Sequence, residues 1–319
     1  MVLQPLPGIG DAIWHLPHLR AIAGATPAGT VSLLTKPRSL ADRLFQAEAS
    51  IARVLWLHRD GGVHDGPAGV FRLATLLRRY RFDVVWVLHQ SPRYALIAWL
   101  AGIPVRHGFG IGAQRWFLNQ PGVLPPALRR AHPIEKATTL LEIKGLRVEG
   151  GIADMAVAAA SRQRVLARFR HLPSPWLAFG LGSSEPDKQW GAPAFAELAL
   201  ARHAAGPCTI FLVGGPAEAE LARLVAEAVR YRGHGVEVAV RLPIDETAAL
   251  LAESRVYVGN DTGAMNLAAA VGTDAVGLFG ASEPLVYSPR LHPLTPASGG
   301  MAGITVEQVM EALSRFGID

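Results

Sequence analysis

The stretch from residue 256 to residue 284 constrains the fold more than any other part of the chain. It opens with a β-branched and aromatic run, passes through the polar turn Asn260-Asp261-Thr262-Gly263, and enters an alanine-rich run that stops at Gly272. A second apolar run follows at residues 275–279. These patterns predict a buried strand, a turn with a helix N-cap, a helix and a second strand. The stretch is therefore predicted to be one βαβ unit.

The turn of this unit is suited to an anion. The backbone N–H groups at the start of a helix have no carbonyl partner within the helix. The helix dipole places partial positive charge at the same point. We therefore expect the turn to be able to hold a diphosphate.

The same residues resemble the nucleotide-sugar motif of glycosyltransferase family 9, the lipopolysaccharide heptosyltransferases. The family pattern is Asp-Ser/Thr-Gly-x-x-His, followed by a helix of small residues and a strand that ends in Phe/Tyr-Gly. This chain has Asp261, Thr262 and Gly263 in place, and Asn266 stands where the family has histidine. The resemblance implies that the N–H groups of Thr262, Gly263 and Ala264 bind the donor diphosphate. It also implies that Asp261 shapes the turn or contacts donor hydroxyls, whereas the change at Asn266 leaves the donor sugar open.

The first residues predict a short strand, a glycine turn and a helix. Gly8-Ile9-Gly10 looks like the start of a dinucleotide fingerprint, but Ile13 stands at the position of the third glycine. No acidic residue ends the second predicted strand either, so a nicotinamide cofactor is not expected.

The same segment resembles the opening of family 9, in which Gly-Asp leads into a helix that contains a proline. Here these residues are Gly10, Asp11 and Pro17. The resemblance implies that Asp11 is the general base that deprotonates the acceptor hydroxyl, and a carboxylate at a glycine turn can reach into a cleft. Capping of its own helix is the alternative role for Asp11, and the two roles are compatible.

A third match to the family follows the predicted strand at residues 176–182. It consists of Ser183, Ser184 and the Lys-x-Trp segment that begins at Lys188. The resemblance implies that Lys188 contacts the donor phosphates and that the two hydroxyls line the same site. A lysine is a suitable point charge for a leaving diphosphate. The alternative for Lys188 is a surface salt bridge with Asp187 or Glu185.

Further donor-site candidates rest on weaker patterns. Glu218 follows the glycine turn after the strand at residues 209–213 and could hold a ribose diol. The helix dipole alone also favours an acidic residue there. The backbone of Pro243 and Ile244 is placed beside the nucleotide base.

On the acceptor side we place Gly10, His15 and Arg79. His15 and His18 have helical spacing, but a pair without a further ligand is a weak metal site, so we interpret both as surface or acceptor-side residues. Arg79 belongs to a basic cluster that is either a solvated helix end or a contact for acceptor phosphates. The tract at residues 106–126 is expected to be an irregular loop on the acceptor side.

The net charge of +5 hides an asymmetry. Residues 1–155 contain 18 Lys and Arg against 10 Asp and Glu, whereas residues 156–319 contain 13 against 16. A basic first domain indicates an anionic glycolipid or glycan acceptor, or contact with the inner membrane face, and an accident of surface charge is the alternative. The sequence shows no nucleic-acid motif and no basic patch interleaved with aromatic residues, so no nucleic-acid partner is expected.

The chain is expected to be cytoplasmic, with peripheral contact to the inner membrane as a candidate. Its first residues lack the basic segment of a signal peptide. The longest apolar stretch, residues 94–105, is about half as long as a membrane-spanning helix. The single cysteine, Cys208, excludes an internal disulfide framework and a four-cysteine zinc site, and it is expected to be a buried structural thiol.

Strands that alternate with helices predict parallel sheets. We therefore expect an α/β chain of two Rossmann-like domains, residues 1–155 for the acceptor and residues 156–319 for the nucleotide sugar. Their sheets are expected to face a cleft, as in the GT-B fold that the resemblance implies. The last helix, residues 305–316, begins with a capping box and is a candidate to pack back on the first domain.

The resemblance implies an inverting glycosyltransferase that moves heptose from ADP-heptose to a lipopolysaccharide core or related surface glycan. It implies no cofactor besides the nucleotide-sugar donor. The sequence shows no Asp-x-Asp metal site, so we expect metal-independent transfer. One alternative is a nucleotide-sugar-binding protein of the same fold without transferase activity, which Asn266 supports. Others are a transferase that uses a different nucleotide sugar, and an epimerase, for which the sequence shows no set of acid and base residues.

Overall fold

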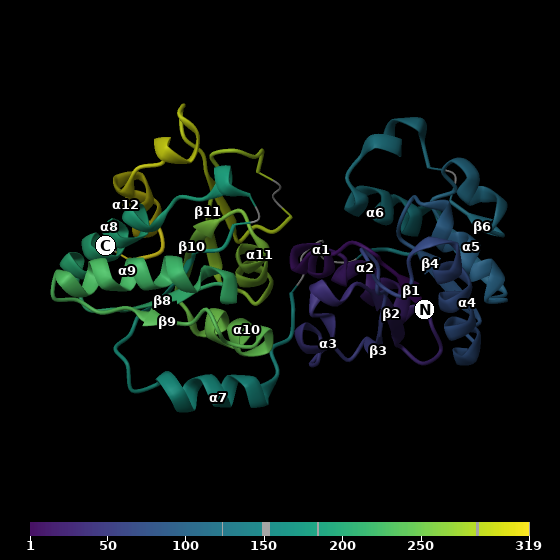
Figure 1. The fold of residues 1–319 in the computed structure, drawn as a ribbon, viewed down its shortest axis with the longest axis horizontal. Coiled ribbons are helices and arrows are strands. Elements are labelled where there is room, and N and C mark those ends of the chain that lie inside the picture. The colour runs from purple at the N-terminus through teal and green to yellow at the C-terminus, as the bar shows by residue number, and fades with distance from the viewer. Residues whose placement is uncertain (123, 149–153, 184, 285–286, 319) are drawn as a thin grey trace. The chain divides into compact units, whose positions relative to one another are not determined.

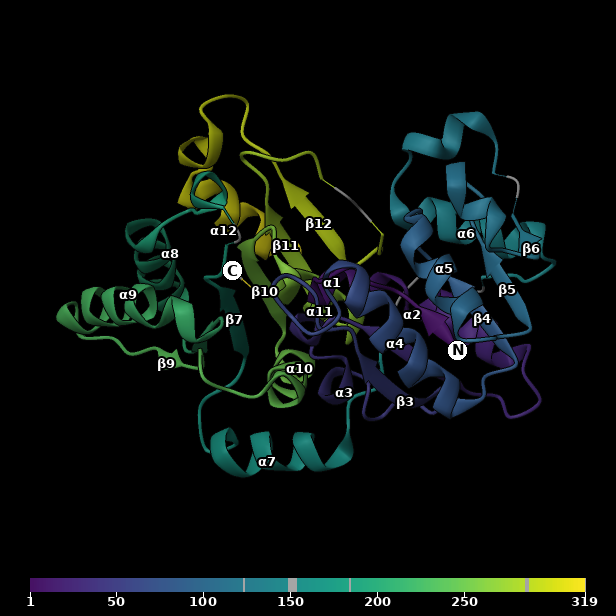
Figure 2. The ribbon, with the colours of Figure 1, turned by 45° about the vertical axis from the view of Figure 1, so that its right-hand side comes forward.

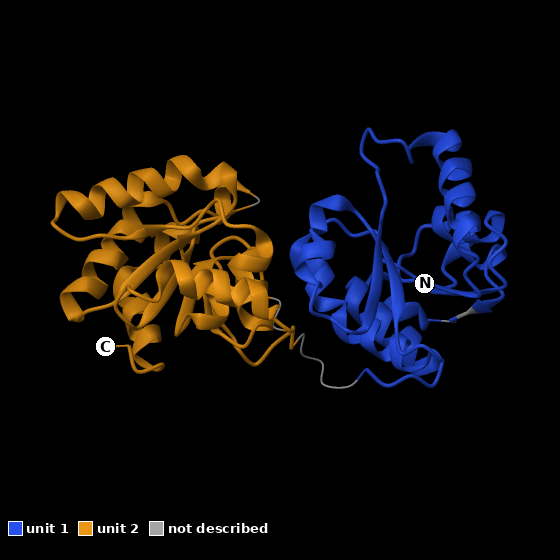
Figure 3. Ribbon diagram, turned by 90° about the horizontal axis from the view of Figure 1, so that it is seen from below, with its two compact units in different colours: residues 1–151 blue, residues 152–319 orange. Residues whose placement is uncertain are grey.

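The computed structural model describes residues 1–319 with the exception of 123, 149–153, 184, 285–286 and 319 (Figure 1). Two compact units divide the chain, residues 1–151 and residues 152–319 (Figure 3). The sequence placed this division after residue 155. Each unit contains a six-stranded sheet in which all paired strands are parallel. The predicted α/β fold with two Rossmann-like parallel sheets is confirmed.

The sheet of unit 1 has the strand order β3-β2-β1-β4-β5-β6, which is the Rossmann order. Its strands are β1 (Val2–Leu3), β2 (Val31–Thr35), β3 (Ile51–Trp56), β4 (Val84–Val87), β5 (Val105–Gly108) and β6 (Gln120–Pro121). Its α-helices are α1 (Ile9–Trp14), α2 (Leu16–Gly24), α3 (Ala41–Leu44), α4 (Gly66–Tyr80), α5 (Pro92–Leu100) and α6 (Pro133–Ile143). Three short 3-10 helices complete the unit: η1 (Pro37–Ser39), η2 (Gly112–Trp116) and η3 (Pro126–Arg130).

The sheet of unit 2 has the strand order β12-β11-β10-β7-β8-β9. This is the same order as in unit 1, read from the opposite edge of the sheet. Its strands are β7 (Trp176–Gly180), β8 (Thr209–Val213), β9 (Glu237–Val238), β10 (Val256–Asn260), β11 (Asp274–Leu278) and β12 (Leu291–Leu294). Its α-helices are α7 (Ala159–Phe169), α8 (Ala192–Ala205), α9 (Ala219–Tyr231), α10 (Ile244–Glu253), α11 (Gly263–Ala270) and α12 (Val306–Ser314). The 3-10 helices are η4 (Pro186–Lys188), η5 (Pro216–Glu218) and η6 (Gly300–Gly303).

The central strands are buried because helices cover both faces of a parallel sheet. Every residue of β7, β8 and β10 is buried, which explains why these strands are continuous apolar runs and do not alternate. Cys208 is buried just before β8, as expected for a structural thiol. Among the helices that the structure describes, none is both long enough and apolar enough to cross a bilayer.

Strand order determines where a ligand can enter each unit. In an open parallel sheet, ligands bind beyond the carboxyl ends of the strands, at the point where the order reverses. This point lies between β1 and β4 in unit 1 and between β7 and β10 in unit 2. Asp11 lies in α1, which follows β1, Lys188 lies in η4, which follows β7, and Asp261 lies in the turn that follows β10.

The last helix, α12, packs within unit 2, where Val309 and Leu313 are buried in that unit's core. Its packing on the first domain stays a prediction. The predicted capping box at Thr305 and Gln308 is confirmed by reciprocal hydrogen bonds of 3.0 and 3.3 Å.

The tract at residues 106–126 is not a single irregular loop. It contains most of β5, then η2 and the short strand β6. Asn119 accounts for part of this order, because its side chain accepts from the Arg106 N–H at 2.9 Å and donates to the Pro104 carbonyl at 2.7 Å. These side-chain bonds hold the segment beside β5, and no propensity pattern shows them in the sequence.

Candidate functional site

The predicted anion-binding turn lies at the end of β10. Thr262 has extended backbone angles and is the N-cap of α11, which begins at Gly263. The first backbone bond across this helix start runs from the Asn266 N–H to the Thr262 carbonyl at 3.3 Å. The N–H groups of Gly263, Ala264 and Met265 therefore have no acceptor within the helix, and all of them lie at the positive end of its dipole. Thr262, Gly263 and Ala264 are half-buried, so the turn is accessible from one side.

Asn260 fastens this turn to the loop that follows β7. It is fully buried at the end of β10. Its side-chain nitrogen faces the carbonyls of Leu181 and Gly182 and the side-chain oxygen of Gln189, at 2.9 to 3.1 Å. Its side-chain oxygen accepts from the Trp190 N–H at 3.2 Å. The sequence pattern around Asn260 predicts only a turn, although an asparagine that ends an otherwise apolar buried strand signals a buried polar partner.

Replacing Asn260 with alanine is expected to lower the free energy of unfolding by about 2–4 kcal/mol, because it leaves several buried polar groups without partners. Urea unfolding measures this loss, and isothermal calorimetry measures the accompanying fall in nucleotide affinity. Asn119→Ala is the matched control, since it removes two side-chain bonds at an exposed position of unit 1. Equal small losses in both variants would contradict the role assigned to Asn260.

Lys188 and Asp261 meet at the switch point of unit 2. The Lys188 Nζ lies 2.9 Å from a carboxylate oxygen of Glu185 and 3.7 Å from one of Asp261. The Glu185 hydrogen bond, with the Asp261 charge, raises the pKa of Lys188, so the amine stays protonated. Ser282 donates to the same Asp261 oxygen at 3.0 Å. The turn thus combines N–H donors with a fixed ammonium, which is the chemistry that binds a diphosphate.

The salt bridge considered as the alternative for Lys188 is present, and its partner is Glu185. The Glu185 side chain is 57% exposed, whereas that of Lys188 is 18% exposed. A salt bridge with one exposed partner contributes little to stability. An incoming phosphate can therefore displace the Glu185 carboxylate from Lys188.

The two serines before Lys188 have different outcomes. Ser183 exchanges hydrogen bonds with the backbone of Glu185 and so shapes the loop. Ser184 lies outside the described residues. A role in donor binding remains a prediction for both.

Glu218 lies at the same edge of the sheet. A Cβ placed on Gly182 would lie 3.8 Å from the Glu218 carboxyl carbon and 3.9 Å from the Thr262 methyl group. Gly182 therefore lies between these two side chains. Glu218 accepts the Gly215 N–H at 2.6 Å, so its carboxylate folds back on its own turn. Both the ribose and the structural interpretation of this residue fit that position.

The remaining donor-side candidates lie on helix starts of unit 2. Pro243 is the N-cap of α10 and Ile244 is its first residue, and both are half-buried. α10 packs against α11, whose first turn carries Asn266, also half-buried. Their contacts with a nucleotide sugar stay predictions.

Asp11 is the third residue of α1, directly after the switch-point strand of unit 1. Its carboxylate accepts the Gly8 N–H at 3.0 Å, so the capping role is present. The side chain is half-buried, as is its neighbour Gly10. A Cβ on Gly8 would lie 2.7 Å from the Asp11 carboxylate, so only glycine at this position leaves the carboxylate in place. Its role as a general base stays a prediction.

The placement of His15 and His18 at the surface is wrong. They are 1% and 2% exposed. Burial lowers the pKa of both, and the proximity of His15 helps to lower that of His18 to about 3, so His18 is neutral at physiological pH. The His15 Nδ1 lies 2.7 Å from the Asp11 carbonyl oxygen, and the His18 Nε2 lies 2.9 Å from the Thr138 hydroxyl. His15 lies at the junction of α1 and α2, and both rings are buried, so neither is exposed for contact with an acceptor.

The structure does not bring Arg79 together with Asp11, so an acceptor contact of Arg79 stays a prediction. Arg79 is exposed in the last turn of α4. A crossover helix runs antiparallel to the strands that it connects, so its last turn lies at the edge where the strands begin. Asp11 lies at the opposite edge, just after the end of β1. The basic cluster therefore does not face the predicted base.

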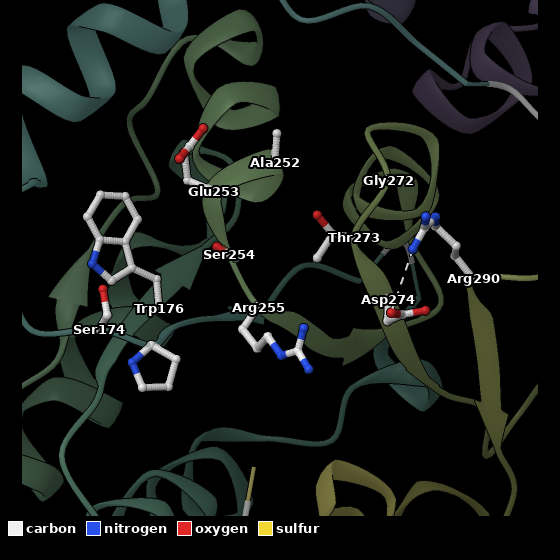
Figure 4. A pocket seen from close by; sticks show the side chains of 11 residues that line it. Ser174, Trp176, Ala252, Glu253, Ser254, Arg255, Gly272, Thr273, Asp274 and Arg290 are labelled. Carbon is white, nitrogen blue, oxygen red and sulfur yellow. Dashed lines mark ion pairs between the residues drawn. The ribbon is translucent and has the colours of Figure 1, made fainter. Parts of the chain in front are cut away.

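One pocket of about 320 Å³ lies in unit 2 where β7, β10 and β11 begin, at the edge opposite the Lys188 turn (Figure 4). Its charged groups already have partners. Arg290 lies 3.7 Å from Asp274, and Arg255 donates to the Phe316 carbonyl. The carboxyl-edge turn is the better candidate site, because ligands of an open parallel sheet bind beyond the carboxyl ends of its strands. Within the described ranges, no group of three or more His, Cys, Asp or Glu side chains is arranged to hold a metal ion.

Two Rossmann-like units, with a lysine and a helix start at the switch point of the second, define the chain as a protein of the GT-B class. The sequence model described as "Glycosyltransferase family 9 (heptosyltransferase)" matches residues 70–303. The chain belongs to this family, as its motifs predicted.

Curated relatives agree with this family. The chain is 28% identical over 243 residues to lipopolysaccharide heptosyltransferase 2 of Salmonella typhimurium. This match covers 69% of this chain and 66% of that protein. The Escherichia coli enzyme of the same name is 27% identical over 234 residues, with the same coverage. The chain thus spans about two thirds of the length of the curated relatives it matches.

Solved structures show the same fold. E. coli ADP-heptose lipopolysaccharide heptosyltransferase II has a TM-score of 0.77 at 20% identity, and the match covers 99% of this chain and 97% of that one. A family 9 glycosyltransferase from Veillonella parvula has a TM-score of 0.82 at 21% identity, with 99% and 95% covered. An E. coli heptosyltransferase solved with ADP has a TM-score of 0.75 at 20% identity, with 99% and 98% covered.

Proposed function

We propose that the chain is an inverting glycosyltransferase that transfers heptose from ADP-heptose to a sugar of a lipopolysaccharide core or related surface glycan. The observation that carries the proposal is the meeting of Lys188, Asp261 and the first turn of α11 at the switch point of unit 2. Membership of family 9 supports the reaction class. The E. coli family structures that contain ADP or ADP-2-deoxy-2-fluoro heptose support the donor class.

In the proposed reaction, Asp11 takes the proton of the acceptor hydroxyl as that oxygen attacks the anomeric carbon of the donor. The new bond joins this oxygen to the anomeric carbon, and the bond from the anomeric carbon to the diphosphate oxygen breaks on the opposite face. The diphosphate leaves with the bonding electron pair. Lys188 and the N–H groups of Thr262, Gly263 and Ala264 stabilise the charge that develops on it.

A second candidate function is nucleotide-sugar binding without transfer, and Asn266 is the observation that favours it. An amide at this position can donate a hydrogen bond to a phosphate or sugar, but it cannot carry the charge of a protonated imidazole. A third candidate keeps the transfer reaction but uses a nucleotide sugar other than ADP-heptose as the donor.

A thermal-shift screen over ADP-, GDP-, UDP- and dTDP-sugars tests the donor. A ligand at a hundred times its dissociation constant stabilises the folded chain by about 2.7 kcal/mol. Because the proposal makes ADP-heptose the donor that binds most tightly, it is expected to raise the unfolding temperature most. ADP release is then measured with and without a core glycan acceptor. Release that requires the acceptor supports transfer, binding without release supports the second candidate, and stabilisation by none of the donors contradicts both.

A further inference from the structure

The charged residues in the range 66–134 of unit 1 are almost all positive. They contain nine arginines and no lysine, against Asp83 as the single acidic residue. The arginines are Arg72, Arg78, Arg79, Arg81, Arg93, Arg106, Arg115, Arg129 and Arg130. This range therefore supplies a net charge of +8 out of the +9 that residues 1–151 carry, and it does so without the acidic partners that ordinarily neutralise a surface.

Large aromatic side chains are exposed among these arginines. Trp116 is 71% exposed, Phe71 is 61% exposed and Trp99 is 51% exposed. Apolar surface of this size in water marks an interaction site when several such side chains lie together.

The helices α4 and α5 bring these residues together. They pack against each other (Figure 2). The 3-10 helix η2 packs against α5. Arg78 of α4 donates to the Leu100 carbonyl at the end of α5. The ring of Trp99 lies 6.1 Å from that of Phe117, which directly follows η2. The end of α4, the end of α5 and the end of η2 are thus neighbours.

The exposed face of α4 continues this area. Phe71, Arg72, Thr75, Arg78 and Arg79 are all exposed, and their spacing places them on one side of the helix. The side chains of Leu73, Ala74 and Leu77 point the other way, into the core of unit 1. We name the outer area the aromatic-arginine surface and define it by the following residues: Phe71, Arg72, Arg78, Arg79, Trp99, Arg115 and Trp116.

We propose that the aromatic-arginine surface binds the headgroup region of an anionic lipid bilayer. Tryptophan rings favour the membrane interface, where one side of the ring is apolar and the other is wet. Each arginine held near an anionic leaflet increases binding by about fivefold. The surface joins both features on the outside of a helical layer, which is the arrangement of a protein that lies on a bilayer.

The shape of this surface favours a bilayer over nucleic acid. Proteins that bind single-stranded nucleic acid hold the backbone in a positively charged groove and stack the bases on aromatic rings. Here the arginines and aromatics lie on the outer side of adjacent helices. The sequence shows no continuous basic patch with aromatics, because the members of this surface come from three separate segments of the chain. The binding does not depend on the transfer reaction proposed above.

Co-sedimentation of the full chain with vesicles tests the proposal. Vesicles of phosphatidylcholine with phosphatidylglycerol are compared with vesicles of phosphatidylcholine alone, at low and high salt. We expect binding to the anionic vesicles, weakened by salt. Trp99→Ala with Trp116→Ala is expected to reduce binding by at least about tenfold. Arg79→Gln with Arg115→Gln is expected to reduce it by about 25-fold.

Unit 2 offers a matched control. Tyr231 is 90% exposed at the end of α9 and is flanked by Arg230 and Arg232. The triple variant Arg230→Gln, Tyr231→Ala, Arg232→Gln is expected to bind vesicles like the unchanged chain. Thermal unfolding and ADP binding of each variant show that the chain remains folded.

Three results would overturn the proposal: equal binding to neutral and anionic vesicles, equal losses in the control variant, or no vesicle binding by the full chain. Binding of a DNA oligonucleotide that is lost in the Arg79 and Arg115 variant, without vesicle binding, would assign the surface to nucleic acid. Loss of vesicle binding with intact ADP binding distinguishes this proposal from the proposed function, which fails only if donor binding or transfer fails.

Discussion

Replacing Asp11 with asparagine is expected to lower turnover at least about a hundredfold and to leave ADP affinity nearly unchanged. The amide cannot accept the acceptor proton at neutral pH, so the chemical step loses its base. Its side-chain oxygen can still accept the Gly8 N–H that the carboxylate accepts at 3.0 Å, so α1 keeps its cap. Steady-state transfer measures turnover, and isothermal calorimetry with ADP measures nucleotide binding.

Asp42→Asn is the matched control for this variant. Asp42 is an exposed carboxylate in the first turn of α3, in the same unit, and it follows no switch-point strand. It is expected to leave turnover unchanged. If Asp11→Asn retains turnover within a few fold of the unchanged chain, while thermal unfolding shows both variants equally stable, Asp11 has no part in the proton transfer.

The parts of the structure that local pattern determines were predictable from the sequence. The strand, turn, helix and strand around Asp261 agree with β10, α11 and β11 to within one or two residues at each end. The apolar runs are unbroken because both faces of each parallel sheet are covered. The position of the glycine turns after these runs also placed Asp11, Lys188 and Asp261 at carboxyl ends of strands.

What the sequence did not show depends on contacts between distant residues. His15 is buried at the junction of α1 and α2, a position that no periodicity reveals. The place of Arg79 follows from the direction in which α4 crosses the sheet, and a cluster of arginines looks the same at either edge. Asn260 bonds to residues about 70 to 80 positions earlier in the chain, so its role requires the pairing of β10 with β7.

Replacing Lys188 with methionine is expected to lower kcat/KM for the donor by about a hundredfold to a thousandfold, the usual loss when one group that stabilises a developing charge is removed. Methionine fills similar space without the ammonium. The free energy of unfolding is expected to change by about 1 kcal/mol or less, because the partner Glu185 is 57% exposed. Initial rates over a range of donor concentrations separate the loss in kcat from the rise in KM.

Glu185→Gln provides the converse test at the same contact. The Glu185 carboxylate lies 2.9 Å from the Lys188 Nζ, where a donor phosphate would have to displace it. Removing its charge while keeping Lys188 is therefore expected to leave donor affinity unchanged or to strengthen it, opposite in direction to Lys188→Met. If both variants lose activity to the same extent, the salt bridge itself supports the loop, and Lys188 does not act on the diphosphate. If Lys188→Met keeps kcat/KM within tenfold, the leaving group is stabilised by the α11 turn without the lysine.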